Sequence, residues 1–548
     1  MKRRYAHKEN VLLVNITRLG DMLQATPTIA GLKQENPNCR ITVLVEKQFE
    51  SVCKIIPGID EVISLDLGMT VRSLAQGGAG IVDAYEMIDE VVTDLRSRNF
   101  DYTLNMSSSA YTALLLRLVG VERRGGWVAD EEGYRVIESD WARLFASSVF
   151  HSNRIFTGLN LVDIFRCSAD VDQHPKHLLL NVDQSSQQFA QSFIEECGFT
   201  NKGPLIAVQA GASQGKRQWN PSRFARFVDV LVNRFDARVV LTGTAKELPI
   251  VTPIKESVVS NNVAIAAGKT NIPQLSALLR LSDLLVTGDT GPMHISVAVG
   301  TPVVSMFLAS AYGFETGPYS EGNLVLQPVI GCGPCNPNKG CARPDCHDTI
   351  DPEVLAELTM MRVRGDIREV PSTLVSPKQL IVYRTTFDEH GFYDMDAINL
   401  GNTRAPEEKI RKAYRRMWLD DLADLKSSDQ PSTKMLAIQD PTLEAFGQIA
   451  QLAGQGEELI RDLVRMIHDE RAPSSELKRV NEALKGLDEV IEKAGFQVPE
   501  LGPVTRMFVF SKENISGSDA SELASQMAGV YQDLFRRSGK LAGYYSAA

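Results

Sequence analysis

The stretch LSDLLVTGDTGPMHISVAVGTPVVSMF, residues 281–307, decides the fold class of this chain. Its apolar run ends in a Gly-Asp-Thr-Gly-Pro turn, a helical segment of small residues follows, and a Gly-Thr-Pro turn leads into a second apolar run. Continuous apolar runs suit strands that are buried on both faces, and their alternation with helical segments is typical of a parallel sheet. The stretch therefore predicts one strand-helix-strand unit of a doubly wound α/β sheet.

The same alternation extends in both directions and defines two halves. The second half begins with the strand-like run at 204–209 and continues with helices expected at 221–235, at about 245–256 and at 272–281. The first half begins with VLLVNI, residues 11–16, and its second strand is RITVLVE, residues 40–46. Ligands bind such sheets at the carboxyl ends of the strands, so we expect the functional site in a cleft between two α/β domains.

The last third of the chain follows a different pattern. After a strand-like pair around LIVYRTTFDEHGFYDMD, residues from about 405 to 548 have apolar positions at three- and four-residue spacing with charges between them. This spacing predicts amphipathic helices. Because the region carries no motif of known chemistry, we expect it to serve interaction or oligomerisation.

Composition restricts the class of protein. The 548 residues are 43% hydrophobic and 23% charged, as in ordinary globular proteins with several domains. The formal charge of −10 argues against broad nucleic-acid binding, which needs a basic surface. The apolar run near the N-terminus is too short for a signal peptide, and no stretch approaches the ~20 residues of a membrane span. We therefore expect a cytoplasmic protein.

The turn at 288–294 carries an acid, a hydroxyl, a glycine and a histidine in a short space. A helix that begins at Gly291 or Pro292 would offer unpaired backbone N–H groups and its positive dipole end to an anion. Thr290 would add a hydroxyl donor, and His294, about one turn into the helix, would reach the same anion. In the alternative interpretation Asp289 and Thr290 cap the helix and His294 is a core residue.

Two further turns follow strand-like runs in the same half. AGASQGKRQWNPSRFARF, residues 210–227, opens with small residues and carries the pair Lys216-Arg217, which is well placed to meet a diphosphate at the helix of Gly291. LTGTAKE, residues 241–247, places Glu247 where its carboxylate would accept hydrogen bonds from ribose hydroxyls. A solvated basic pair and an exposed helical glutamate are the alternatives.

Together with VLLVNITRLGDMLQATPTIAGLK, residues 11–33, these motifs resemble glycosyltransferase family 9, the bacterial heptosyltransferases. The resemblance extends from about Asn10 to Ile350, with four separated motifs in the family's order. It implies the GT-B architecture, two Rossmann-like domains facing across a cleft, and an inverting reaction that uses ADP-heptose or a related nucleotide sugar. It implies no catalytic divalent metal, and we discount Asp-x-Asp at 170–172 and 394–396 as chance matches.

Carried over position by position, the resemblance implies two catalytic residues. Asp21 matches the base that takes the proton from the acceptor hydroxyl, and Lys216 matches the lysine that stabilises the departing diphosphate. The positions that match the donor site are Glu247, Asp289, Thr290, Gly291 and His294. Asp289 is expected to orient backbone groups or Lys216 without touching phosphate. The alternative for Asp21 is a cap of a helix that begins at Met22.

The alternation of strands and helices, the resemblance and the helical periodicity of the last third together predict a division of the chain. We expect an acceptor-binding Rossmann-like domain at 1–180, a nucleotide-sugar-binding Rossmann-like domain at 181–370, and a mainly helical extension at 371–548. The second domain contains a Cys-rich loop at 331–347.

That loop has four cysteines in a glycine- and proline-rich setting, at Cys332, Cys335, Cys341 and Cys346. Four thiolates suit a tetrahedral zinc or iron site with no open position, which would be structural; four reduced thiols are the alternative. Family members that modify autotransporter proteins resemble this loop and hold iron through four cysteines in an oligomer, which favours iron slightly. His347 is a substitute ligand.

The leading hypothesis is a heptosyltransferase of lipopolysaccharide core or related surface glycan assembly. The alternatives are a protein O-heptosyltransferase and a non-catalytic, metal-stabilised scaffold of the same fold. The presence of both Asp21 and Lys216 speaks against the scaffold. The expected partners are a nucleotide-sugar donor, a glycolipid or protein acceptor, the inner membrane as a peripheral contact, and further copies of the chain, but no nucleic acid.

Overall fold

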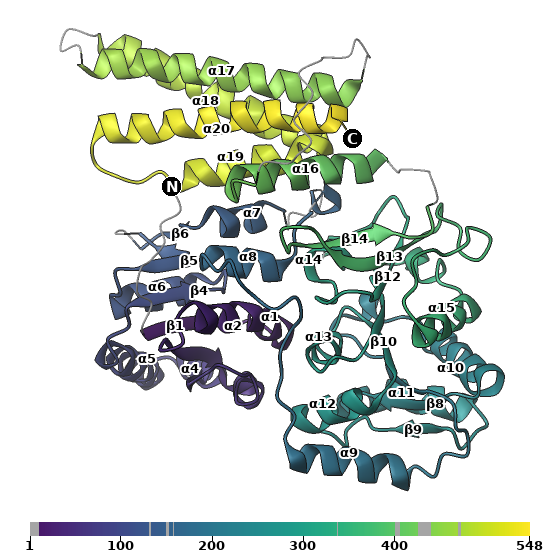
Figure 1. The fold of residues 1–548 in the computed structure, drawn as a ribbon. Coiled ribbons are helices and arrows are strands. Elements are labelled where there is room, and N and C mark those ends of the chain that lie inside the picture. Colours follow the sequence, from purple (N-terminus) through teal and green to yellow (C-terminus); the bar gives the residue numbers. More distant parts are fainter. Residues whose placement is uncertain are drawn as a thin grey trace. The chain divides into compact units, whose positions relative to one another are not determined.

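The computed structural model describes residues 10–130, 133–148, 153–156, 158–336, 338–400, 406–425, 440–468 and 473–547. The chain forms two compact units, one of Met1–Gly126 with Leu159–Thr403 and one of Trp127–Gly158 with Arg404–Ala548. The first unit contains two α/β sheets, and the second is mainly helical (Figure 1).

The first sheet has parallel strands in the order β3-β2-β1-β4-β5. These strands are β1 (Asn10–Asn15), β2 (Arg40–Glu46), β3 (Glu61–Leu65), β4 (Tyr102–Asn105) and β5 (Arg124–Ala129), and the end of β5 pairs antiparallel with β6 (Arg135–Ile137). The predicted strands at 11–16 and 40–46 are therefore β1 and β2. Both are buried almost throughout, as continuous apolar runs require.

Helices cover both faces of this sheet. On one face α5 (Ala79–Ser97) and α6 (Ala110–Val119) pack Val92, Leu95 and Leu115 against Leu12 and Val14 of β1. On the other face α2 (Thr26–Glu35) contacts α8 (Leu161–Ser168) (Figure 1). The other helices of this half are α1 (Leu19–Gln24), η1 (Lys47–Phe49), α3 (Glu50–Cys53) and α4 (Leu67–Gln76).

The second sheet has the strand order β14-β13-β12-β11-β10-β7-β8-β9. Its strands are β7 (Leu205–Gln209), β8 (Arg238–Thr242), β9 (Val263–Ile265), β10 (Leu284–Gly288), β11 (Val303–Met306), β12 (Leu324–Pro328), β13 (Leu380–Phe387) and β14 (Tyr393–Ala397). The strands from β12 to β9 are parallel, whereas β13 and β14 add antiparallel. The stretch at 281–307 forms β10, α13 (Gly291–Ala298) and β11, the predicted strand-helix-strand unit.

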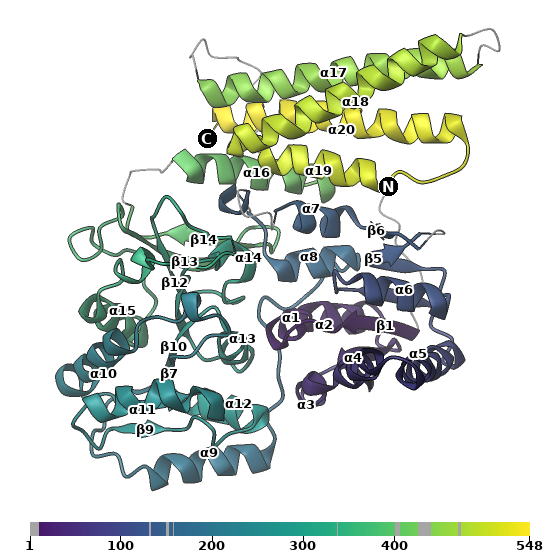
Figure 2. The same ribbon diagram turned by 180° about the vertical axis from the view of Figure 1, so that it is seen from behind.

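The helices of this half also form two layers. Helix α10 (Pro221–Phe235) contacts α11 (Leu248–Ser257) and α15 (Pro352–Arg364) on one face, while α12 (Ile272–Leu281) contacts α9 (Gln184–Glu196) and α13 on the other (Figure 2). The shorter elements are η3 (Gly215–Arg217), η4 (Ala245–Glu247), α14 (Gly313–Thr316) and η5 (Asp345–His347). The helices predicted at 221–235 and 272–281 have these bounds.

Both sheets reverse their strand order next to their first strand. In the first sheet β1 lies between β2 and β4, and in the second β7 lies between β8 and β10. The turns that follow β1, β7 and β10 therefore leave the carboxyl ends of strands at a topological switch point, where open α/β sheets bind ligands. The turn after β7 contains the Lys216-Arg217 pair, the turn after β10 contains Asp289, and Asp21 lies in the first turn of α1, directly after the turn that follows β1.

The second unit joins two distant parts of the chain. Its elements are β6, α7 (Asp140–Ser148) and η2 (Arg154–Phe156) together with α16 (Pro406–Leu422), α17 (Pro441–His468), α18 (Ser474–Gln497), η6 (Pro499–Leu501), α19 (Gly502–Glu513) and α20 (Ala520–Ala547). Helices α17 and α20 pack closely, because Gly456 lets the ring of Tyr531 approach its backbone. The strands at 380–397 belong to the first unit, and the predicted division at 180 and 370 remains a prediction.

Across the described part of the chain, no helix is both long and apolar enough to span a bilayer.

Candidate active site

A cavity of about 680 Å³ lies within the first unit, lined by the turns at the switch points of both sheets. Arg18 to Asp21, Gln24 and Phe49 line it from the first sheet. The second sheet contributes the following lining residues: Gln209, Gly211, Ala212, Ser213, Arg217, Gly243, Thr244, Glu247, Thr270, Asn271, Ile272, Leu275, Asp289, Thr290, Gly291, Pro292, His294, Ile295 and Thr316. Of the predicted catalytic and donor-site residues, the cavity brings together Asp21, Glu247, Asp289, Thr290, Gly291 and His294.

Asp21 lies in the first turn of α1, whose N-cap is Arg18. The helix thus begins three residues before the Met22 start considered from the sequence, and Asp21 is inside it. The hydroxyl of Thr17 donates a hydrogen bond to Oδ2 of Asp21 at 2.6 Å. The side chain is partly exposed to the cavity, but enclosure by the surrounding protein raises its pKa, against the lowering effects of Thr17 and Arg18. Burial with few compensating charges is a common route to a carboxylate that exchanges protons.

Asp289 follows β10 and has a cationic partner. Arg217 donates from its NH1 group to Oδ2 of Asp289 at 2.9 Å, and the Thr316 hydroxyl donates to Oδ1 at 3.2 Å. The guanidinium also donates through Nε to the hydroxyl of Ser310 at 2.9 Å. Both partners of the ion pair are mostly buried, with side-chain exposures of 12% for Arg217 and 13% for Asp289. The pair therefore presents a fixed guanidinium at the edge of the cavity.

His294 is buried in α13, and its Nδ1 atom has no hydrogen-bond partner among the described residues. Burial lowers its pKa from 6.5 to about 4, with a smaller opposing effect of Asp289, so the ring is neutral near pH 7. The ring lies against α1, since a Cβ atom at Gly20 would be 3.0 Å from Cδ2 of His294. A buried nitrogen without a partner that lines a cavity is suited to a polar ligand atom.

Thr290 and Gly291 open α13 at the cavity. Thr290 is the N-cap by backbone geometry, but its hydroxyl pairs with the Thr287 hydroxyl at 2.8 Å and not with the helix. A Cβ at Gly291 would lie 2.9 Å from the Leu19 side chain, so this glycine lets α13 approach α1 closely. Thr290, Gly291 and Pro292 line the cavity, so the helix starts there with its positive dipole end.

Glu247 ends η4 and points toward the turn after β7. Its Oε2 accepts hydrogen bonds from the backbone N–H and the hydroxyl of Thr244, at 2.6 Å and 2.9 Å, and its Oε1 accepts from Gln209 at 3.0 Å. A Cβ at Gly211 would overlap this carboxylate, so only glycine fits beside it. The carboxylate is thereby held in one orientation on the cavity wall.

Lys216 is directed to a different place from its neighbour Arg217. Its ammonium donates hydrogen bonds to the backbone carbonyls of Asn336 and Lys339, both at 2.8 Å. Among the described residues that line the cavity, Arg217 is present and Lys216 is not. The predicted role of Lys216 at the leaving group remains a prediction. The sequence pattern of the basic pair gave no means of choosing between the two side chains.

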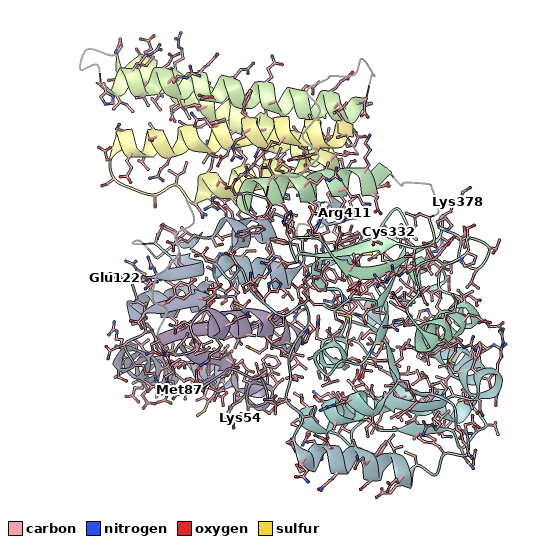
Figure 3. The ribbon with its side chains drawn as sticks, in the orientation of Figure 1. Lys54, Met87, Glu122, Cys332, Lys378 and Arg411 are labelled. Atoms are coloured by element: carbon pink, nitrogen blue, oxygen red, sulfur yellow. The ribbon has the colours of Figure 1, made fainter. Side chains whose placement is uncertain are left out.

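The four loop cysteines lie near one another. Burial raises the pKa of Cys335, and the neighbouring thiols of Cys332, Cys346 and Cys341 raise it further. Cys332 and Cys341 are exposed, whereas Cys346 is buried (Figure 3 labels Cys332). Over the residues that the structure describes, however, no three His, Cys, Asp or Glu side chains are grouped closely enough to hold a metal ion. His347 instead places Nε2 at 3.0 Å from the carbonyl of Lys216.

Two residues contribute to the site beyond those predicted to be catalytic or donor-binding. Arg217, predicted only as one of a basic pair that meets a diphosphate, and Thr316, for which the sequence predicts no role, both hold Asp289. The sequence does contain an indication that Arg217 lies at the site, because its loop follows the strand β7 at the switch point. None is visible for Thr316, whose short helix α14 has no feature typical of a ligand site.

Two Rossmann-like sheets whose strand ends meet at one cavity define the GT-B fold class. The solved structure of a glycosyl transferase family 9 protein from Veillonella parvula has this fold, with a TM-score of 0.52 and 20% identity over 65% of this chain and 97% of its own. Residues 89–343 match the model of glycosyltransferase family 9 (heptosyltransferase), so the chain carries a domain of this family.

Curated relatives agree with this classification. Lipopolysaccharide heptosyltransferase 3 of Escherichia coli is 25% identical over 319 residues, which are 56% of this chain and 84% of the relative. The lipopolysaccharide core heptosyltransferase OpsX of Haemophilus influenzae is 25% identical over 325 residues, 58% of this chain and 84% of its own. The predicted family resemblance, the GT-B fold and the glycosyltransferase activity are thereby confirmed. Asp21 lies before the residues matched by the family model, and the roles of the individual site residues remain predictions.

Proposed function

We propose that this protein transfers heptose from ADP-heptose to a hydroxyl of a lipopolysaccharide core or related surface glycan. The names of the curated relatives support the sugar and the acceptor class. The observation that carries the proposal is that the carboxyl of Asp21 and the start of α13 line the same cavity. The negative charge of Asp289 contributes to the raised pKa of Asp21, so the two turns are close enough to interact electrostatically.

In this proposal the diphosphate of the donor binds where α13 begins. The backbone N–H groups at the helix start and the guanidinium of Arg217 provide positive charge, and Nδ1 of His294 provides a further polar contact. Glu247, held by Thr244 and Gln209, accepts hydrogen bonds from the ribose hydroxyls. Asp289 then serves the donor indirectly, by fixing Arg217.

The transfer step follows from these positions. Asp21 takes the proton from the acceptor hydroxyl while that oxygen attacks the anomeric carbon, and the bond from this carbon to the β-phosphate oxygen breaks. The electron pair of the broken bond leaves with ADP, and Arg217 with the α13 N–H groups stabilises the charge that develops there. Attack from the side opposite the leaving group inverts the anomeric centre. In this step the side chains and the helix start provide both the base and the positive charge, so the proposal assigns no role to a metal ion.

The direct test is mass spectrometry of the products formed by the purified full chain with ADP-heptose. Three acceptors are compared: truncated lipopolysaccharide core, the same core already carrying the heptose, and a serine- and threonine-rich protein. Mass addition to the truncated core alone supports the proposal. Addition to the protein alone would replace it with protein O-heptosyl transfer, and no addition to any acceptor, with no ADP binding, would favour the scaffold.

The proposal includes a location at the cytoplasmic face of the inner membrane. A nucleotide sugar is water-soluble whereas a glycolipid acceptor is held in a bilayer, so an enzyme that uses both must work at the membrane surface. Co-sedimentation of the chain with vesicles, with and without lipopolysaccharide core in them, tests this contact.

We also propose that the four-cysteine loop holds structural iron or zinc. Sulfur ligands suit either metal, and the mutual effect of the thiols on the pKa of Cys335 shows that they are neighbours. Among the described residues, such side chains are not grouped closely enough to hold a metal ion. Four thiolate ligands would leave no coordination position open for a reactant, so we propose a structural role for the ion. Metal analysis should find about one ion per chain, as four thiolates fill one tetrahedral site. The ion should be lost when Cys332 and Cys335 are both replaced by Ser, while activity of the folded protein persists.

A further inference from the structure

The loop of residues 331–347, here the cysteine loop, is attached to the turn that follows β7. The ammonium of Lys216 donates to the carbonyls of Asn336 and Lys339, and Nε2 of His347 lies 3.0 Å from the carbonyl of Lys216. The indole Nε1 of Trp219, which is fully buried, donates to the carbonyl of His347 at 3.0 Å. These contacts fix the chain on both sides of Arg217.

A second attachment reaches the segment that contains Ser310, a hydrogen-bond partner of Arg217. The backbone N–H of Cys335 donates to the carbonyl of Ala309 at 2.8 Å. Ala309 has a φ of 55°, in the left-handed region that side chains other than glycine, asparagine and aspartate seldom adopt. The next residue, Ser310, accepts the hydrogen bond from Nε of Arg217. The cysteine loop therefore contacts Lys216, which precedes Arg217 in the chain. It also contacts Ala309, which precedes Ser310, the hydroxyl partner of Arg217.

We infer that the cysteine loop positions Arg217 for the donor diphosphate, with Lys216 as a positioning residue that acts through Arg217. This inference rests on the proposed function, because it assigns a purpose to the guanidinium in the cavity. A guanidinium recognises phosphate through a rigid fork of donors, so its direction affects binding as much as its charge does.

The turn itself supplies little rigidity, which explains why an external support is needed. Residues 210–214 contain Ala, Gly, Ala and Ser before a single turn of η3, and regular secondary structure resumes only at α10. A segment with few backbone hydrogen bonds of its own samples several conformations unless other parts of the fold hold it. Two carbonyl acceptors for one ammonium, together with the Trp219 indole, provide that support.

The test uses the full chain with the variant Lys216→Met, which keeps the aliphatic stem and removes the ammonium. Lys255→Met is the matched control, because Lys255 also donates to a backbone carbonyl, that of Ser260, elsewhere in the same half. Calorimetry with ADP and with AMP distinguishes binding of the β-phosphate from binding of the rest of the nucleotide. We expect Lys216→Met to weaken ADP binding about tenfold, as for a misplaced charged hydrogen bond, with AMP affinity unchanged within about twofold. Lys255→Met should leave both affinities unchanged.

A double-mutant cycle distinguishes an indirect role from direct contact of Lys216 with the diphosphate. If Lys216 acts through Arg217, Lys216→Met should cost nothing further for ADP binding in an Arg217→Met background. Additive losses would overturn the inference and restore Lys216 as a diphosphate ligand. The substitution pair at Ala309 tests the second attachment: Ala309→Gly should retain ADP affinity, whereas Ala309→Val, which disfavours positive φ, should weaken it.

Hydrogen–deuterium exchange without any nucleotide makes the inference independent of the proposed donor. Lys216→Met should speed exchange in the peptide covering 210–219, whereas Lys255→Met should not. Unchanged exchange in that peptide would overturn the inference even if ADP binds. A wild-type chain that binds neither ADP nor AMP would overturn the proposed function, and the exchange result would still decide whether the cysteine loop orders this turn.

Discussion

Asp21 and Asp289 occupy comparable places in the two sheets but have different surroundings. Each follows a strand beside a switch point and stands at the start of a short helix on the cavity wall. Asp289 is bound by the Arg217 guanidinium and the Thr316 hydroxyl. Asp21 accepts a hydrogen bond from the hydroxyl of Thr17, and burial raises the pKa of its carboxyl. The difference indicates that the carboxylate of Asp21 is suited to accept a proton, whereas the carboxylate of Asp289 anchors a cation.

The largest expected effect comes from removing the proposed base. Asp21→Asn keeps the shape of the side chain and its contact with Thr17, so ADP affinity should stay within about twofold while turnover falls about 10²–10⁴-fold. Steady-state kinetics with ADP-heptose and calorimetry with ADP measure the two quantities. Turnover close to that of the wild type would remove the functional distinction between the two aspartates.

The next effect concerns His294, which packs between the two aspartate turns. Its pKa is 6.5 before burial and about 4 in the folded protein, so between these values the unfolded state binds the extra proton. The contribution of His294 to the free energy of unfolding is thus fully present above about pH 6.5 and is lost as the pH falls toward 4. From pH 7 to pH 5 the free energy of unfolding should decrease by about 2 kcal/mol for this reason.

Urea unfolding at these two pH values, for the wild type and for His294→Gln, isolates that contribution. The variant lacks the titrating ring, so its stability should fall less on acidification than that of the wild type. Equal pH dependence in both proteins would mean that His294 has an ordinary pKa and an environment more open than the structure shows.

The smallest expected effect is a change in the pH–rate profile when the threonine that bonds to each aspartate is replaced. Thr17→Val removes a hydrogen bond that lowers the pKa of Asp21, so that pKa should rise and the acid limb of the pH–rate profile should move to higher pH. Thr316→Val acts on Asp289 and should leave this limb in place. Equal shifts in both variants would show that the limb does not report Asp21.

Much of the fold was predictable because its signals are local. The strands β1 and β2 and the helices α10 and α12 follow from apolar runs, a Pro at the first helical turn and side-chain caps from Asn220 and Asn271. The start of α1 was less predictable, because Arg18 is its N-cap without a side-chain hydrogen bond. No local signal indicated that residues 127–158 share a compact unit with the C-terminal helices.

The candidate site was predictable to the level of the turn. Asp289, Thr290, Gly291 and His294 stand together in the sequence, so their arrival at one cavity wall required only that β10 end there. Asp21 and Glu247 line the same cavity only because of the fold. Their proximity was predictable from the family resemblance and not from local sequence.

The sequence by itself determined the class of sheet, the order of the motifs and the chemical groups that each turn carries, because periodicity and residue type are local properties. Tertiary structure alone decided which of two adjacent cations enters the cavity. Lys216 finds its acceptors 120 and 123 positions away and Arg217 finds Asp289 72 positions away. In a turn without periodic structure, side-chain direction follows from such distant partners, and the burial that lowers the pKa of His294 likewise arises only when α1 packs against α13.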